Sequence, residues 1–563
     1  MNVLGLNYYF HDSSACVMSD GRLVAAAEEE RFVREKHTRR FPARAIDECL
    51  RLAGLDYGDI EHIAVGCSPL RDWGKRLRYA GLDPSRAREF VVGELRRLGT
   101  RQSGLAAWLF SNYASRRLPS VHFVPHHIAH VVGSYYVSPH ESAALLALDG
   151  SGEWATSFLG VARGPAFECF QQSEFPMSLG SFYEAVTEFC GFMPNYDEGK
   201  TMGLAPYGDP RRFREVVRGL VSVDGDGRLG VDLSYFDYHS DGQRRCGPKF
   251  HDVFGAPRRR GEDFADRHRD AAAAFQEVLE ERVLSLCGIL KRRTAEKNLV
   301  IAGGVALNSV MNGRIVRESG FHDLYVMPGA GDNGTAIGAA AFVVHSTLGQ
   351  PRHAVHDDPF LGGQHSPAAM KRALEAFSLP AVERPDVVGE VARRLHEGKI
   401  VGWFQGRTEF GPRSLGNRSI LANPTLPEMK DQLNLRVKHR ESFRPFAPSV
   451  TREKKAEHFE TEVDDPFMLK VCYVRPSSRA KLPAITHVDG SARLQTVHRE
   501  TNPRYHALLT RLEPLIGAPV VLNTSFNVMD QPIVETPREA IECFLATGID
   551  TLALGDFVVD KNE

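Results

Sequence analysis

The sequence predicts an α/β protein built from two domains. Its 563 residues exceed the size at which a single hydrophobic core is usual, so at least two packed domains are expected. A unit of strand, polar turn and strand occurs twice, at residues 2–27 and 142–162. Strands that run into glycine-rich turns occur at residues 298–304 and 324–334. Strands alternating with helices in this way are typical of the α/β class.

The strands of the two repeated units are short and apolar, and turn residues separate them. A tight turn at Tyr9–Ser14 follows the first strand, and the polar turn Asp149–Glu153 follows the first strand of the second unit. The predicted strands are Asn2–Asn7, Ala15–Ser19, Arg22–Ala27, Ser142–Leu148 and Ala155–Ala162. The first three are expected to form a meander.

A helix, a strand and a glycine turn follow one another from residue 270 to residue 304. Apolar residues recur at helical spacing between Asp270 and Leu290, and the strand Asn298–Ile301 runs into Gly303 and Gly304. The order of strand, glycine turn and helix recurs at residues 324–340. Because glycine lets backbone N–H groups approach a phosphate closely, both turns are candidates for contact with one nucleotide.

Residues 349–364 are rich in Pro, Gly, His and Asp and lack periodicity, which predicts a linker. We therefore expect one domain at residues 1–348 and a second at residues 365–563. The second domain is predicted to contain the helices Pro367–Phe377 and Val387–Glu397, the strand Ile400–Phe404 and a final strand region at Thr551–Val559.

Composition excludes several classes of function. Lys plus Arg (69) nearly cancels Asp plus Glu (71), so neither nucleic acid nor a membrane surface is an expected partner. No apolar run is long enough to cross a bilayer and the first residues do not resemble a signal peptide, which predicts a cytoplasmic protein. Nine cysteines lie singly with no CxxC pair, so they are expected to be reduced core residues and not a disulfide or zinc framework.

Two histidines four residues apart, His126 and His130, are candidate metal ligands. On a helix they share one face, and neutral imidazoles bind divalent metals. With 22 histidines, about one such pair arises by chance, so the spacing alone does not establish a site. Asp149 and Asp332 lie in glycine-rich turns and complete a mixed set of nitrogen and oxygen ligands. This set suits Fe(II), Mn or Zn, with Fe(II) as our first choice.

The turn that carries Asp149 also has the character of a phosphate-binding loop. The backbone amides of Gly150, Ser151 and Gly152 could face phosphate oxygens, while Asp149 serves a cation. An Asp-Gly turn between two strands is equally an ordinary hairpin signal, so this motif alone leaves both interpretations open.

Cationic residues gather in the second domain although the chain as a whole is nearly neutral. They lie in residues 406–419 and 438–448 and at Arg493, interleaved with Gly, Pro and Phe. A charged surface patch is the ordinary alternative, but the interleaving is more typical of a shaped loop. We interpret the region as an anion pocket.

Six motifs in a fixed order resemble the NodU/CmcH carbamoyltransferase family. They are HHxxH at 126–130, LDGSGE at 148–153, SLGxFYxxxTxxxGF at 178–192, EGKTMGLAPYG at 198–208, AGGVALN at 302–308 and GAGDNGTAIGAA at 329–340. They span the first three fifths of the chain, and six ordered matches are far harder to obtain by chance than any one of them.

The resemblance implies a fold and a set of roles. The first domain should have the actin-like ATPase fold, a duplicated RNase H-like fold, and the second should be a YrdC-like α/β domain. The metal ligands carry over to His126, His130, Asp149 and Asp332, and the general base to His11 in the motif Phe10-His11-Asp12. An imidazole is suited to take a proton from an attacking alcohol, although His11 could also be a simple turn residue.

The resemblance also implies a second site and the cofactors. Carbamoyl phosphate and ATP should bind the second domain, where Lys438 and Arg444 are the candidate catalytic residues. ATP, a divalent transition metal and Mg with the ATP are the implied cofactors. The candidate nucleotide and phosphate contacts are Asp12, Gly150, Ser151, Gly152, Lys200, Gly303, Gly304, Asn308 and Asn333 in the first domain, and Arg413, Arg440, Arg493, Ser525 and Asn527 in the second.

The implied activity is ATP-dependent O-carbamoyl transfer from carbamoyl phosphate to a hydroxyl of a small natural-product acceptor, with carbamoyl adenylate as intermediate. Threonylcarbamoyl transfer to tRNA and a non-catalytic nucleotide-binding regulator are the alternatives. The first lacks a basic surplus for RNA. The residues that select the acceptor are expected in variable loops at residues 72–120 and 223–260. The oligomeric state stays open, and a homodimer is compatible with the sequence.

Overall fold

The computed structural model describes residues 1–82, 84–240, 244–352 and 355–561 and shows two compact units. The first contains Met1–Glu29 and His37–His356, and the second contains Glu30–Lys36 and Asp357–Glu563. Residues 353–354 of the predicted linker lie outside the described residues. The sequence had placed every residue before 349 in one domain, whereas residues 30–36 group with the second unit. There Arg34 donates to the carbonyl oxygen of Ile533 at 2.8 Å.

The first sheet of the first unit has the strand order β3-β2-β1-β4-β5. The predicted meander is confirmed, because β1 pairs antiparallel with β2 and β2 with β3, while β4 and β5 extend the sheet in parallel. The helix α2 (Ala43–Ala53) packs on β2 and β3. The strands are β1 (Asn2–Asn7), β2 (Ser14–Ser19), β3 (Arg22–Glu28), β4 (His62–Val65) and β5 (Ser120–Phe123).

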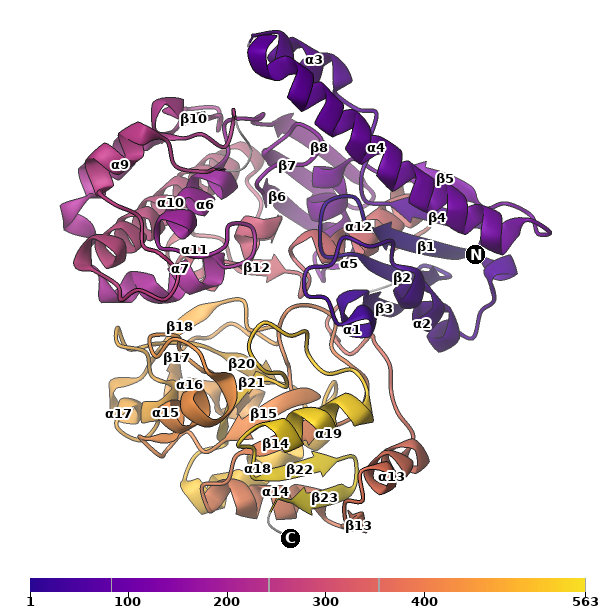
Figure 1. Ribbon diagram of the computed structural model, residues 1–563, viewed down its shortest axis with the longest axis vertical. Helices are drawn as coiled ribbons and strands as arrows, with labels where there is room; N and C mark the ends of the chain where they lie inside the picture. The colour runs from indigo at the N-terminus through magenta and orange to yellow at the C-terminus, as the bar shows by residue number, and fades with distance from the viewer. Residues whose placement is uncertain (83, 241–243, 353–354, 562–563) are drawn as a thin grey trace. The chain divides into compact units, whose positions relative to one another are not determined.

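The second sheet repeats this topology. Its order is β12-β11-β6-β7-β8, with an antiparallel meander β6-β7-β8 and two parallel strands on the other side of β6. The strands are β6 (Ser142–Leu148), β7 (Ser157–Arg163), β8 (Ala166–Gln171), β11 (Asn298–Ala302) and β12 (Asp323–Val326). Two sheets of one topology in one unit define the duplicated actin-like ATPase fold that the resemblance implied (Figure 1).

The small-residue helix α12 (Thr335–Phe342) brings the metal-ligand candidates together. It packs on the first sheet and on the segment that contains His130. A Cβ on Gly338 would lie 1.7 Å from the carbonyl oxygen of Ala129, and a Cβ on Gly133 would lie 2.1 Å from the Cα of Gly338. Only glycine permits this approach, so the small residues of α12 place Asp332, just before the helix, beside the histidines.

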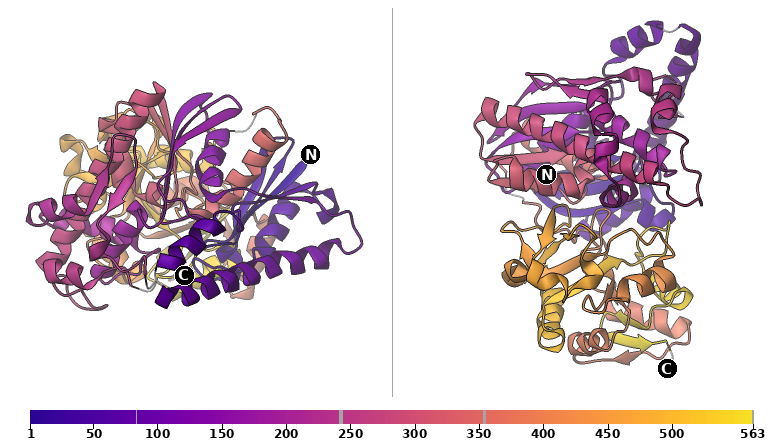
Figure 2. Two further views of the ribbon diagram at one scale, coloured as in Figure 1. Left: turned by 90° about the horizontal axis from the view of Figure 1, so that it is seen from above. Right: turned by 90° about the vertical axis from the view of Figure 1, so that its left-hand side faces the viewer.

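The remaining helices of the first unit complete the ATPase half-domains or extend from them. The long helix α4 (Pro84–Tyr113) follows α3 (Trp73–Leu82), and its length is visible in Figures 1 and 2. Residues 72–120 were expected to be variable loops, and the two helices correct that expectation. Leu105 and Trp108 are buried at helical spacing, which holds the end of α4 against the unit. Residues 83 and 241–243 of the two stretches lie outside the described residues.

The second unit is built on an eight-stranded mixed sheet of order β13-β23-β22-β14-β15-β21-β16-β20. Its strands are β13 (Val382–Glu383), β14 (Val401–Phe404), β15 (Arg418–Ala422), β16 (Ala447–Thr451), β20 (Gln495–Val497), β21 (Val520–Ser525), β22 (Thr551–Leu554) and β23 (Phe557–Asp560). A separate small sheet contains β17 (Phe459–Glu460), β18 (Val471–Val474) and β19 (Ser491–Arg493).

Alternating side chains of the large sheet build one core on each face. Trp403 of β14 packs with α14 (Val387–His396) and α18 (Pro503–Ile516), whereas the next residue, Phe404, packs with α13 (Pro367–Ala376) and α19 (Pro537–Ala546). The helices predicted at 367–377 and 387–397 and the strand predicted at 400–404 are confirmed to within a residue at each end.

Candidate functional site

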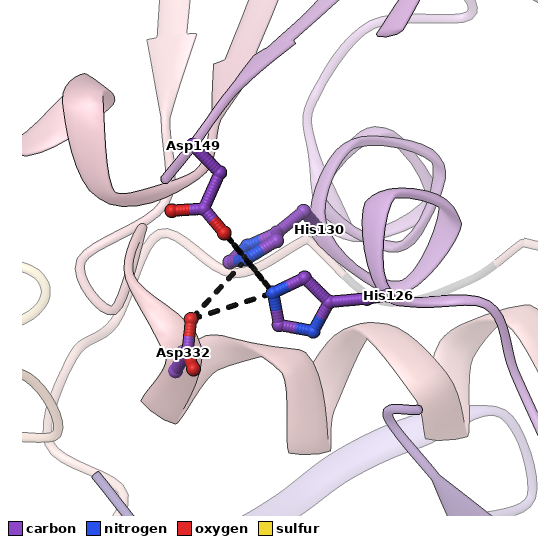
Figure 3. A group of neighbouring side chains, drawn as sticks. All are labelled: His126, His130, Asp149 and Asp332. Atoms are coloured by element: carbon purple, nitrogen blue, oxygen red, sulfur yellow. Dashed lines mark hydrogen bonds and ion pairs between the residues drawn. The ribbon is translucent and has the colours of Figure 1, made fainter. Parts of the chain in front are cut away.

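His126 and His130 lie at the start of a helical segment whose residues Ile128–Val132 form a π-helical turn. A π-helix has more residues per turn than an α-helix, so residues four apart remain on one face. The buried imidazoles point toward each other, with their Nε2 atoms 3.0 Å apart (Figure 3). The two histidines therefore share one helical face as predicted, although the turn is π-helical and not α-helical.

Asp149 and Asp332 complete a buried cluster with these histidines. One ligand atom from each of the four residues lies within 4.8 Å of the others. His126 Nε2 is 3.1 Å from Asp149 Oδ2 and 3.4 Å from Asp332 Oδ1, and His130 Nε2 is 3.5 Å from Asp332 Oδ1. Asp149 directly follows β6 and Asp332 lies in the turn before α12, so three segments that are distant in the sequence meet here (Figure 3).

The hydrogen bonding of His126 fits a metal ligand. Its Nδ1 lies 3.2 Å from the carbonyl oxygen of Gly66, which can only accept, so Nδ1 carries a proton and the neutral ring presents the Nε2 lone pair to the cluster. Burial opposes protonation of His126, but the charge of Asp332 outweighs it and raises the pKa. The two carboxylates thus favour a positive charge within the cluster. Two imidazoles and two carboxylates suit one divalent transition ion.

Glu153 orients this cluster, and the sequence analysis gave it no role. Its buried carboxylate accepts the backbone N–H of His126 at 3.0 and 3.1 Å and that of Ser68 at 2.6 Å. It therefore caps the start of the helical segment that presents both imidazoles. Its place in LDGSGE, directly after the Asp149 turn, was the available signal.

The glycine turns pack tightly around Asp149. A Cβ on Gly303 would lie 2.2 Å from the carbonyl oxygen of Leu148, and Gly304 N–H donates to Asp149 Oδ1 at 3.2 Å. A Cβ on Gly152 would lie 2.9 Å from the Cβ of His126. These contacts bring the predicted loop of Gly150, Ser151 and Gly152 and the Gly303-Gly304 turn to the same carboxylate.

Three residues predicted to contact a nucleotide also have partners within the protein. Lys200 pairs with Asp197, with Nζ and Oδ1 2.9 Å apart. Asn308 caps the helix α11 (Ser309–Glu318) by accepting the N–H of Met311 at 3.0 Å. Asn333 donates to Glu28 Oε1 at 2.8 Å and so links its turn to β3. Each of these contacts stabilises the local fold, and the roles of the three residues toward a nucleotide stay predictions.

His11 lies beside the cluster. Its Nε2 is 3.8 Å from Asp332 Oδ2, while its Nδ1 is 2.9 Å from Asp12 Oδ2. Burial alone would lower the pKa of His11, but the charge of Asp332 and the hydrogen bond with Asp12 raise it to about 10. Asp12, predicted as a cofactor contact, lies between two imidazoles, and the Nδ1 of His37 is 2.7 Å from its other oxygen. The sequence analysis did not identify His37.

The second unit contains a cationic loop shaped by a buried carboxylate. Glu409 Oε1 accepts the backbone N–H groups of Leu415, Asn417 and Arg418 at 2.8, 3.1 and 3.1 Å. This closes residues 409–418 into a compact turn that carries Arg413. The shaped loop predicted from the interleaved Gly and Pro residues is present, and Glu409 is the residue that the prediction lacked.

Lys438 links two segments that contain predicted phosphate contacts, residues 438–448 and residues 525–527. Its buried ammonium group donates to the carbonyl oxygens of Ser525 and Asn527 at 2.5 and 2.9 Å and to Asn527 Oδ1 at 2.9 Å. Burial lowers its pKa, and the nearby charges of Arg440, Arg444 and Lys36 lower it further. Lys36 belongs to residues 30–36 of this unit and was not predicted.

Four arginines lie close enough to perturb one another. Burial first, and then the charge of Arg444, lower the pKa of Arg413, Arg440 and Arg493, that of Arg493 to about 10. Within the described part of the chain, the buried Nε atoms of Arg413 and Arg493 have no hydrogen-bond partner. Guanidinium groups that repel one another and have unused donors are typical of sites that bind oxyanions.

The fold and the two sites define the class. The chain combines an actin-like ATPase unit that contains an imidazole–carboxylate cluster with an α/β unit that contains a cluster of arginines. Family models named carbamoyltransferase N-terminus and carbamoyltransferase C-terminus match residues 2–341 and 392–561. The chain is a member of this carbamoyltransferase family and is therefore a carbamoyltransferase enzyme.

Relatives with similar sequences agree with this assignment. Nodulation protein NolNO of Sinorhizobium fredii is 37% identical over 99% of this chain and 80% of its own length. Nodulation protein NolO of Bradyrhizobium diazoefficiens is 40% identical over 77% of this chain and 78% of its own. A Synechocystis protein is 39% identical over 100% of this chain and 97% of its own.

Solved structures resemble the chain only remotely. The (R)-2-hydroxyglutaryl-CoA dehydratase component A of Acidaminococcus fermentans aligns with 61% of this chain and 97% of its own, at 14% identity and a TM-score of 0.32.

Among the helices in the described ranges, none is both long enough and apolar enough for a bilayer crossing.

Proposed function

We propose that the chain is an ATP-dependent O-carbamoyltransferase that divides two reactions between its two units. The observation that carries the proposal is the contrast between the sites. The second unit concentrates half-buried arginines, and two of them have buried Nε donors without a partner, which suits phosphate oxyanions. The first unit places a histidine beside an imidazole–carboxylate cluster, which suits proton transfer next to a bound cation.

Activation belongs to the second unit. Water and carbamoyl phosphate give carbamate and phosphate, and a carbamate oxygen then attacks the α-phosphorus of ATP. The bond from that phosphorus to pyrophosphate breaks, so the products are carbamoyl adenylate and pyrophosphate. Arg413, Arg444 and Arg493 hold the phosphate oxygens, because planar guanidinium groups bind them in a bidentate manner. Lys438 holds the Ser525–Asn527 segment in place through the contacts described above.

Transfer belongs to the first unit. A hydroxyl oxygen of the acceptor attacks the carbonyl carbon of carbamoyl adenylate, AMP leaves, and His11 Nε2 accepts the hydroxyl proton. His126, His130, Asp149 and Asp332 would hold a divalent transition ion, with Fe(II) as our first candidate. Such a cation supplies positive charge for the phosphate of the leaving AMP and, by neutralising the two carboxylates, favours the neutral form of His11. We propose a small natural product as the acceptor.

The first test concerns the order of the chemistry. We expect pyrophosphate release from ATP to require carbamoyl phosphate, because carbamate is the attacking group. Purified protein should be assayed for pyrophosphate with ATP alone, with carbamoyl phosphate alone and with both. Equal release without carbamoyl phosphate would contradict the activation step and revive the alternative of a nucleotide-binding regulator. Carbamoyl transfer only to tRNA would favour the threonylcarbamoyl-type alternative.

The second test concerns the metal. We expect about one transition ion per chain by elemental analysis and a loss of that ion in His130→Ala, because a three-ligand site binds far more weakly. Chelation should also lower the midpoint of thermal unfolding, because an ion bound only by the folded state stabilises it. His122→Ala, in β5 of the same unit, is the matched control and should retain the ion. Full metal content in His130→Ala would contradict the assignment.

A further inference from the structure

The carboxylate of Asp12 lies between two imidazoles. Oδ2 faces His11 Nδ1 at 2.9 Å, and Oδ1 faces His37 Nδ1 at 2.7 Å. Burial would raise the pKa of Asp12, but the hydrogen bonds with both histidines lower it below its usual range. Asp12 is therefore an anion that accepts one N–H on each oxygen, and the second donor comes from a residue 25 positions along the chain.

The backbone holds this arrangement in two linked turns. Asp12 and His37 have φ values of 54° and 55°, in the left-handed region that few residues other than glycine adopt. The N–H of Ser13 donates to the carbonyl oxygen of Thr38 at 3.1 Å, which joins the two turns. Asn7 Nδ2 donates to the carbonyl oxygens of His11 and Asp12 at 2.9 Å each. Two uncommon conformations fixed by cross-links indicate that the side-chain placement matters.

The His37 ring is also supported from its side. It lies 4.7 Å from the ring of Tyr196, and Tyr196 accepts a hydrogen bond from Arg39 Nη2 at 3.1 Å. The His37 side chain is 26% exposed, so solvent reaches part of it. The contacts of His37 include Asp12 and Tyr196.

We infer that His37 is a positioning residue that fixes Asp12 and, through Asp12, the ring of His11. A carboxylate held by one hydrogen bond can rotate about its own axis, whereas bonds on both oxygens fix its plane. A fixed Asp12 maintains its hydrogen bond with His11 Nδ1. The other ring nitrogen, His11 Nε2, then faces Asp332, with Nε2 and Oδ2 3.8 Å apart. This inference rests on the proposed function, in which Nε2 accepts the proton of the acceptor hydroxyl.

The kinetic test uses substitutions that separate the hydrogen-bond donor at the Nδ1 position of His37 from the imidazole ring as a whole. His37→Asn places an amide N–H at the position of Nδ1. His37→Gln has a side chain one methylene longer, so its amide N–H lies beyond that position. His37→Ala removes the donor. With supplied carbamoyl adenylate and methanol as a minimal hydroxyl acceptor, we expect His37→Ala to lower kcat for methyl carbamate by about 10- to 100-fold with little change in KM. His37→Asn should recover most of that loss, and His37→Gln should not.

Two controls make the result decisive. Hydroxylamine attacks a carbonyl without base assistance, so its reaction with carbamoyl adenylate should fall much less in His37→Ala than the methanol reaction does. In a His11→Ala background, His37→Ala should cost nothing further, because a residue that acts only through His11 loses its effect when His11 is absent. Equal loss in His37→Asn and His37→Ala would overturn the inference, since His37 would then act through its ring.

A spectroscopic readout keeps the inference testable if the proposed function fails. The Nδ1–H proton of His11, identified by its absence in His11→Ala, should appear in the proton NMR spectrum as a downfield signal protected by Asp12. We expect His37→Ala to broaden or shift this signal and His37→Asn to restore it. An unchanged His11 signal in His37→Ala would overturn the positioning role whatever the enzyme transfers. A restored signal without turnover would instead count against the proposed function.

Discussion

Replacement of His11 by alanine is expected to abolish carbamoyl transfer while carbamoyl adenylate still forms. His11 Nε2 lies on the side of the imidazole–carboxylate cluster, and its other nitrogen is held by Asp12. Loss of a general base lowers a rate on the order of 10²- to 10⁴-fold. Quantification of the carbamoylated acceptor and of carbamoyl adenylate by mass spectrometry measures both steps in one reaction.

The matched control for this variant is His322→Ala, which removes an exposed imidazole from the same unit. It should transfer and activate like the unmodified enzyme. Loss of both adenylate formation and transfer in His11→Ala would contradict the assignment of His11 to the transfer step alone. Activation would then depend on a residue of the first unit. Transfer at an unchanged rate would assign the base role to a different group.

Replacement of Arg444 by alanine is expected to have the opposite effect and to abolish carbamoyl adenylate formation. Arg444 is the common neighbour in the cationic site, because its charge lowers the pKa values of Arg413, Arg440, Arg493 and Lys438. Loss of one such phosphate contact lowers a rate on the order of 10²- to 10³-fold. Pyrophosphate release in the presence of carbamoyl phosphate measures the step directly.

The stability of the same variant provides an independent check. Removing one charge relieves the repulsion among the remaining cations, so Arg444→Ala should unfold at the same temperature as the unmodified protein or higher. Arg452→Ala, which removes an arginine paired with Asp464 at 2.8 Å in the same unit, should instead leave pyrophosphate release unchanged. A variant of Arg444 that is less stable and still forms adenylate would show that Arg444 serves the fold and not the phosphate.

Local sequence pattern predicted the elements of the fold well, because their physical causes are local. The alternation at Asn2–Asn7 and the apolar spacing between Asp270 and Leu290 are confirmed as β1 and as part of the helix α10 (Asp266–Thr294). The assignment of residues 30–36 to the second unit could not be predicted, since it depends on contacts such as that of Arg34 with Ile533, 499 residues away.

The same distinction applies to the candidate sites. The His126–His130 spacing and the glycine turns predicted the cluster of the first unit, because all four of its residues lie in sequence motifs. Glu153 and His37 were missed because each acts on a residue far along the chain, through a backbone N–H group or a shared carboxylate. Glu409 was missed because its partners are backbone N–H groups of its own loop, which have no side-chain signal. Spacing in the sequence contains no record of such bonds. Asn308 and Asn333 show the converse, in which motif residues serve a helix cap and a strand contact.

The central claim is that activation and transfer are separate reactions in separate units, and chemical rescue tests it most directly. Carbamoyl adenylate should be supplied to the Arg444→Ala and His11→Ala variants in the absence of carbamoyl phosphate and ATP, and the carbamoylated acceptor should be measured by mass spectrometry. The account predicts that supplied adenylate restores transfer by Arg444→Ala and leaves His11→Ala inactive. Restored transfer by His11→Ala, or no rescue of a folded Arg444→Ala protein, would contradict it.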